Sequence, residues 1–335
     1  MGGSGGNRTT SLMLAESTSE IHAFLRAAAL WSARGLPPLW VAWHVRLRGT
    51  LPKAAASRRT PKRAARSQAR LVAMSSNLLV VDLGNTNIVL GVYRGEELVN
   101  SWRLATARER TADEYGILAR QLVGDAMHAS LEGAIVASVV PPLNSAIAFM
   151  IRKYFGIDPL FVEPGVKTGI AIHVDNPQEV GADRIVNCAA AHDRYGGPTV
   201  IVDFGTATTF DVVTANAEFV GGVIAPGLNI SAEALFARAA RLPRVDIRRP
   251  DRVIGTNTVV NMQSGIYFGY LGLVDGILAR IRTEVPNLQR VVATGGLASL
   301  FAEESEHIDD VDPELTLKGL KIIYDRNRTP RRTRK

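Results

Sequence analysis

The chain has little of several residue types and patterns on which common functions depend. It has one cysteine, Cys188, which excludes an intramolecular disulfide and a cysteine-based zinc site and is typical of a reducing cytosol. No apolar run reaches the roughly 18 residues that a membrane-spanning helix needs. The patterns GxxxxGK[ST] and GxGxxG are missing, which removes the signatures of P-loop and Rossmann nucleotide sites. With 46% hydrophobic and 6% aromatic residues, the composition indicates an α/β protein with a sizeable core.

Basic charge is concentrated at the two ends of the chain. Residues 1–76 contain twelve Lys/Arg and two Glu, and the ten residues from Arg326 contain six Lys/Arg and no acid. The stretch between them carries 21 basic and 30 acidic residues, although the net charge of the whole chain is +7. We therefore expect neither nucleic acid nor a membrane as a partner of the main body.

Residues 1–76 differ in kind from the rest. They begin with MGGSGG, which is typical of a flexible leader, and continue with an apolar stretch at 23–47 and the basic stretch KAAASRRTPKRAARSQAR. Such a segment fits a transit peptide, a basic stretch on a membrane surface, or an extended translation start upstream of Met74. We predict a basic extension, disordered or non-native, over 1–76 and a basic tail over 328–335.

One sequence motif, an apolar run followed by Asp-x-Gly, occurs twice in the chain. Residues 80–89 read VVDLGNTNIV, and residues 201–210 read IVDFGTATTF. In each half we predict three strands around the turn, at 78–81, 88–93 and 98–104, and at 199–202, 210–213 and 218–224. Further strands are predicted at 133–140, 159–163 and 290–296, and helices at 111–129, 141–154, 229–242 and 258–284. Thr111 and Glu114 have the spacing of a capping box. This order predicts a duplicated α/β unit.

A strand that ends in Asp-x-Gly and turns back surrounds an anion with backbone N–H groups and small hydroxyls. It also leaves a carboxylate that can hold a cation. We call residues 82–89 the first aspartate turn and residues 203–209 the second aspartate turn. If the two face each other, they can hold a polyphosphate from both sides. Gly295 and Gly296, after an apolar strand, would let an adenine and ribose lie against the backbone.

These motifs carry a resemblance. DLGNTNIVLGVY, DFGTATTFDVV and VVATGGLA resemble the phosphate-1, phosphate-2 and adenosine motifs of the acetate and sugar kinase, Hsc70 and actin superfamily. The resemblance implies two ribonuclease H-like domains around an ATP cleft, at 77–197 and 198–327. NPQEVGADRIVN resembles the signature of type III pantothenate kinases, and KTGIAIHVDNP, GGVIAPGLNIS, GTNTVVNMQSGI and LTLKGLKIIYDRN are similar to the same family.

The resemblance implies a cytoplasmic, homodimeric kinase that uses ATP, Mg²⁺ and a monovalent cation, K⁺ or NH₄⁺, to phosphorylate pantothenate in coenzyme A synthesis. It implies that Asp183 is the general base, that Asp203 binds the monovalent cation, and that Thr258 reaches the substrate of the neighbouring subunit. The implied ATP contacts are Asp82, Leu83, Gly84, Asn85, Thr86, Asn87, Ile88, Val89, Thr206, Gly295 and Gly296. The implied pantothenate contacts are Val174, Gly181, Ala182, Asp183, Arg184 and Thr258. At Val174 the family often has a tyrosine; His173 beside it is either a replacement ligand or a loop residue without a role.

Two other functions stay open. A same-fold accessory or regulatory protein would not need the base Asp183, and another small-molecule kinase of the superfamily would not need the GADR sequence before the second aspartate turn. A role carried by the basic tails is the weakest alternative. Deleting residues 1–73 would abolish such a role, whereas the kinase hypothesis predicts retained activity.

Overall fold

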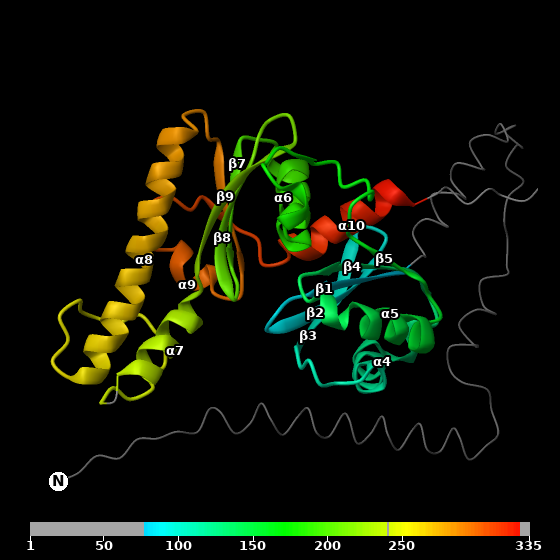
Figure 1. The fold of residues 1–335 in the computed structure, drawn as a ribbon, viewed down its shortest axis with the longest axis horizontal. Helices are drawn as coiled ribbons and strands as arrows, with labels where there is room; N and C mark the ends of the chain where they lie inside the picture. Colours follow the sequence, from blue (N-terminus) through cyan, green and yellow to red (C-terminus); the bar gives the residue numbers. More distant parts are fainter. Residues whose placement is uncertain (1–76, 240, 329–335) are drawn as a thin grey trace, which may run out of the picture. The chain divides into compact units, whose positions relative to one another are not determined.

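Two mixed β-sheets carry the fold of residues 77–239 and 241–328, which this computed structural model describes (Figure 1). All of these residues belong to the unit Lys62–Lys335. The predictions for residues 1–76 and 329–335 lie outside the described residues. Within the described ranges, no helix is long and apolar enough to cross a membrane.

The first sheet has the order β3-β2-β1-β4-β5. Its strands β1, β2 and β3 form an antiparallel meander, and β4 and β5 continue the sheet in parallel with β1. Two helices, α4 and α5, follow β3 and β4 in the chain. The bounds are β1 Asn77–Leu83, β2 Asn87–Arg94, β3 Glu97–Ala105, α4 Ala112–His128, β4 Leu131–Ser138, α5 Pro141–Phe155 and β5 Pro159–Phe161.

The second sheet has the order β11-β10-β7-β8-β9-β6. Strands β7, β8 and β9 form the same antiparallel meander, and β10 and β11 pair in parallel on the far side of β7. Five strands therefore repeat the order and directions of the first sheet, which confirms the predicted duplication. The bounds are β6 Ala171–Ile172, β7 Thr199–Phe204, β8 Ala207–Val213, β9 Glu218–Pro226, β10 Arg290–Gly295 and β11 Asp310–Val311.

The helices of the second half are distributed over both faces of its sheet. Helices α7, α8 and α9 cover one face, and α6 and α10 cover the other (Figure 1). The bounds are a 3₁₀ turn Pro177–Glu179, α6 Ala182–Tyr195, α7 Leu228–Arg238, α8 Thr258–Glu284, α9 Ala298–Ala302 and α10 Leu315–Asn327. The capping box at Thr111 and the helix at 258–284 are confirmed. The helix predicted over 229–242 ends at Arg238.

Alternation along β1 and β7 decides which residues face α6 and α10. Val80 in β1 and Ile201 in β7 pack in one core with these two helices, whereas their neighbours Val81 and Val202 pack into cores on the opposite faces. Since successive strand residues point to opposite faces, every second position of both strands is directed at the helix layer.

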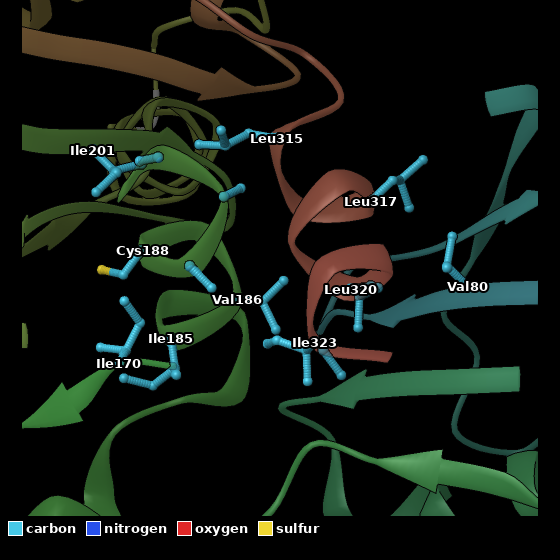
Figure 2. Packing of buried hydrophobic residues seen from close by; sticks show 14 of the residues in the cluster. Val80, Ile170, Ile185, Val186, Cys188, Ile201, Leu315, Leu317, Leu320 and Ile323 are labelled. Carbon is cyan, nitrogen blue, oxygen red and sulfur yellow. The ribbon is translucent and has the colours of Figure 1, made fainter. Parts of the chain in front are cut away.

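Helix α10 lies between α6 and the first sheet. Figure 2 shows Leu320 and Ile323 of α10 between Val186 of α6 and Val80 of β1, and all four side chains are fully buried. Cys188 lies in the same core, where burial raises the pKa of its thiol well above the ordinary value. The last helix of the chain therefore packs against strands from its first third. The predicted boundary between 197 and 198 stays a prediction.

Candidate active site

The two aspartate turns meet at their tips. The hydroxyl oxygens of Thr86 and Thr206 lie 2.7 Å apart and share a hydrogen bond. Each turn is closed by a backbone hydrogen bond from its glycine: the N–H of Gly84 donates to the carbonyl of Asn87, three residues later, and the N–H of Gly205 donates to that of Ala207, two residues later. Two segments 120 residues apart in sequence thus present matching turns to one place.

The aspartates that start these turns point to the same layer. Asp82 lies two residues after Val80 in β1, and Asp203 lies two residues after Ile201 in β7, so both carboxylates are on the sheet faces that contact α6 and α10. Leu83 and Ile88 are buried in the opposite core of the first sheet. Of the predicted ATP contacts, these two are placed to offer a nucleotide their backbone only.

Asp183 stands in the first turn of α6, which begins at Ala182. One carboxylate oxygen accepts a hydrogen bond of 2.8 Å from the N–H of Arg184. Gly181 precedes the helix, and a methyl group on it would lie 2.5 Å from that oxygen. A side chain at 181 would therefore displace the carboxylate. Among the described residues, Asp183 forms no ion pair.

The carboxylates of Asp82, Asp183 and Asp203 interact electrostatically. Burial, together with the charges of Asp183 and Asp203, raises the pKa of Asp82 to about 8, although the charge of Arg103 has the opposite effect. Burial and the charge of Asp183 raise the pKa of Asp203 to about 7. Burial also raises the pKa of Asp183 above its ordinary value. The site therefore has an excess of negative charge that bound cations would relieve.

Asn187 links α6 to the second aspartate turn. Its side-chain N–H₂ donates to Asp203 at 3.0 Å, and its carbonyl oxygen accepts from the hydroxyl of Thr316 on α10 at 2.8 Å. Asn187 is buried and follows Asp183 by one helical turn, so the two share a face of α6. The hydrogen bond from Asn187 opposes the rise in the pKa of Asp203.

The predicted adenosine contacts lie beside the second aspartate turn. Gly295 ends β10 in register with Phe204, and its φ of +90° is one that residues with a side chain rarely adopt. A methyl group on Gly295 would lie 2.6 Å from a carboxylate oxygen of Asp203 and 2.7 Å from the backbone of Phe204. The next residue, Gly296, approaches Arg103 of the first sheet.

Arg184 is held against the second sheet. It donates from Nε to Asp211 at 2.6 Å, and its Nη2 lies 2.5 Å from the same carboxylate oxygen. The Asp211 side chain is fully buried and that of Arg184 is 15% exposed. The guanidinium also lies over the ring of Phe219, 5.2 Å from its centroid. A methyl group on Gly222 would lie 3.1 Å from Nη2 of Arg184, which places the guanidinium beside β9.

Val174 follows β6 in the chain and lies beside the neighbouring residue of β9, Gly221. Its Cγ1 would be 4.0 Å from a methyl group on Gly221, and the side chain packs against the core that α6 and α10 share. His173 is 59% exposed, with its ring 3.9 Å from the carboxylate of Glu218. The predicted substrate contacts Val174 and Arg184 therefore border the same stretch of β9, whereas His173 points toward Glu218.

Thr258 lies in a different part of the fold. It opens α8 and lines an apolar groove of about 570 Å³ between α7 and α8, together with Leu228, Ala232 and Met262. These helices cover the opposite face of the second sheet from α6 (Figure 1). Within this chain, Thr258 and Asp183 are thus on opposite faces of that sheet.

The polar side chains of the two aspartate turns and Arg103 fit a nucleoside triphosphate with a divalent ion. Hydroxyls of Thr86 and Thr206, the amide of Asn85 and the cation of Arg103 suit phosphate oxygens. In the part of the chain that the structure describes, no three His, Cys, Asp or Glu side chains are grouped to hold a metal by themselves. Mg²⁺ typically keeps waters and takes one or two carboxylates plus substrate phosphates, and Asp82 would offer such a carboxylate, which leaves Asp203 for a monovalent cation.

Three residues of this region were not assigned by the sequence analysis: Arg103, Asn187 and Asp211. Asn187 could have been found from its i+4 spacing to Asp183, and Asp211 from its charge within the otherwise apolar stretch TFDVV. Arg103 had no local signal, because its relation to Asp82 depends on how three strands pair.

Comparison with known proteins adds the following. A family model described as type III pantothenate kinase matches residues 78–280. The type III pantothenate kinase of Koribacter versatilis is 56% identical over 269 residues, covering 77% of this chain and 98% of the relative. Those of Geobacter sulfurreducens and Moorella thermoacetica are 56% and 54% identical, each covering 75% of this chain and 99% of the relative.

Proposed function

This chain belongs to the type III pantothenate kinase family, and we propose that the site at its two aspartate turns phosphorylates pantothenate with Asp183 as the general base. The reaction is the ATP-dependent transfer of a phosphoryl group to the primary hydroxyl of pantothenate, within coenzyme A synthesis. The observation that supports the assignment most is geometric. Asp183 stands one helical turn before Asn187, whose side chain donates to Asp203 at 3.0 Å, and the two aspartate turns meet through Thr86 and Thr206.

Phosphoryl transfer to an alcohol requires positioning and charge neutralisation more than covalent chemistry by the protein. In the proposed site, Asp183 accepts the proton of the attacking hydroxyl, a role that typically contributes about 10²–10⁴-fold. Burial raises the pKa of this carboxylate, which makes it a stronger base once it is ionised. The hydrogen bond from the N–H of Arg184 fixes one carboxylate oxygen and leaves the other for the substrate.

The remaining predicted residues have complementary tasks. The first aspartate turn and Thr206 bind the triphosphate, and Gly295 and Gly296 bind the adenosine. Arg184, held by Asp211, binds the carboxylate of pantothenate, and Val174 contacts its dimethyl group. Asp82 would orient a Mg²⁺ ion, which would neutralise phosphate charge, and Asp203 would hold K⁺ or NH₄⁺. The family's use of ATP in a biosynthetic step favours a cytoplasmic location.

A homodimer with a shared site is the arrangement that brings Thr258 to a substrate. Large apolar side chains are exposed on α7 and α8, including Ile230 at 45%, Leu235 at 39% and Val259 at 40%. Exposed apolar surface of this kind is typical of an interface.

A mixture of Asp183→Asn and Thr258→Ala subunits should regain activity, because each mixed dimer would contain one intact site. If the two variants form mixed dimers and these dimers stay inactive, the site is not shared between subunits.

The test of the function is ADP release by the wild-type protein on addition of pantothenate, with mass detection of 4′-phosphopantothenate. Glucose and acetate serve as control acceptors, since the other kinases of the superfamily act on sugars or acetate. Pantothenate-dependent ADP release with the expected product supports the proposal. Release that is independent of pantothenate, or a preference for a control acceptor, would overturn it.

A further inference from the structure

We propose that Arg103 is a catalytic residue of this kinase, which binds the polyphosphate of ATP from the first sheet. The inference rests on the proposed function and adds a cationic group to a site whose predicted ATP contacts include none. Arg103 lies on β3, outside both aspartate turns and the glycine turn.

The register of the first sheet brings Arg103 to the site. Asp82 pairs with Val89 on β2, and Val89 pairs with Arg103 on β3, so the three residues form one row across the sheet. Residues in such a row point to the same face. Val89 packs against the core shared with α6 and α10, whereas Trp102 and Leu104 pack on the opposite side. Arg103 therefore shares the face of Asp82.

The guanidinium reaches the second half of the site. A methyl group on Gly296 would lie 3.3 Å from Nη1 of Arg103, so this nitrogen borders the glycine turn after β10. Its charge also acts on Asp82, whose carboxylate it favours. One side chain thus borders both the start of the first aspartate turn and the proposed adenosine turn, which is where the phosphates that join γ-phosphate to adenosine must lie.

Arg103 is available for such a ligand. Its side chain is exposed, and no hydrogen bond or ion pair within 4 Å joins it to another described residue. The equivalent row of the second sheet runs from Asp203 through Thr209 to Ile224, and so has no cation at this position. The duplicated unit therefore provides a guanidinium on one side only, and its five N–H donors suit bidentate contact with phosphate oxygens.

The test compares Arg103→Gln and Arg103→Lys with wild type in two measurements. The first is the dissociation constant for ATP, ADP and AMP, followed by calorimetry. The second is the rate of ADP formation with saturating pantothenate. Arg94→Gln is the matched control, because Arg94 is an exposed arginine at the opposite end of β2 and pairs with Asn77 rather than with the turn.

Arg103→Gln should weaken ATP and ADP binding by about 10-fold or more and lower kcat/KM for ATP by roughly 10²–10³, with AMP binding changed less than about twofold. Arg103→Lys should recover part of the loss, since it restores charge without the bidentate geometry. Unchanged ATP affinity and turnover, or an equal loss for AMP and ATP, would overturn the assignment. If wild type binds ATP but does not use pantothenate, the proposed function fails, while the comparison of ATP with AMP still decides the role of Arg103.

Discussion

Replacing Asp211 by asparagine removes the negative partner of Arg184 while keeping the shape of the side chain. In the wild type the carboxylate of Asp211 is fully buried, accepts from Arg184 at 2.6 Å and from the hydroxyl of Thr209 at 3.0 Å. The guanidinium is 15% exposed, so water can replace little of the lost interaction. The variant therefore leaves a mostly buried positive charge without its counter-ion.

The expected magnitude follows from this burial. Removing one partner of a buried ion pair typically costs 3–5 kcal/mol, and the value here should be about 3 kcal/mol, because the amide oxygen can still accept one hydrogen bond. For a folded body of roughly this size, that corresponds to a fall in Tm of about 6–12 °C. Since Arg184 would lose its fixed orientation, KM for pantothenate should rise by about 10-fold or more, with a smaller change in kcat.

The assay combines thermal unfolding with initial rates over a range of pantothenate concentrations. Asp125→Asn is the control, because it breaks an ion pair to Arg120 in which the aspartate is 91% exposed, and it should change neither quantity appreciably. In an Arg184→Met background, Asp211→Asn should raise KM little further. A wild-type Tm and KM in Asp211→Asn would refute this account of how Arg184 is held.

Three further predictions concern the carboxylates and the glycine turn. Because the pKa values of Asp82 and Asp203 are raised to about 8 and 7 in the folded state, the protein without nucleotide and potassium should lose stability as pH rises from about 4 to 8, and Asp203→Asn should reduce that slope in thermal unfolding. Asp203→Asn should also abolish stimulation by potassium, measured against tetramethylammonium at equal ionic strength; stimulation that persists would exclude Asp203 as the ligand. Gly295→Ala should raise the dissociation constant for ATP by at least about 10-fold through its positive φ and its collision with Asp203 and Phe204, and unaltered binding would show that the turn can relax.

The strands around both aspartate turns could be predicted from local sequence alone. Each is a short apolar run that ends at an aspartate and a glycine, and the duplicated order of elements indicated the duplicated fold. The predicted helix 229–242 extends four residues beyond the observed end of α7 at Arg238. The small and apolar residues after Arg238 continue the helical sequence pattern up to Pro243, although the helix itself does not continue.

The contacts that complete the site depend on tertiary structure. Arg103 joins Asp82 only through the pairing of β1, β2 and β3, and Asp211 meets Arg184 only when α6 packs on the second sheet. Thr316 fixes Asn187 from a helix 129 residues further along the chain. The motifs therefore predict the chemistry, while the residues that orient the motifs could be found only from the packing of α6 and α10 between the sheets.

The most direct measurement is the turnover of Asp183→Asn with ATP and pantothenate at saturating concentrations. Loss of the proton acceptor should lower kcat by about 10²–10⁴, equivalent to roughly 3–5 kcal/mol in the barrier, with dissociation constants for ATP and pantothenate within about twofold of wild type. A variant that turns over at the wild-type rate, or that fails only because it no longer binds ATP, would contradict the assignment of Asp183 as the base between the two aspartate turns.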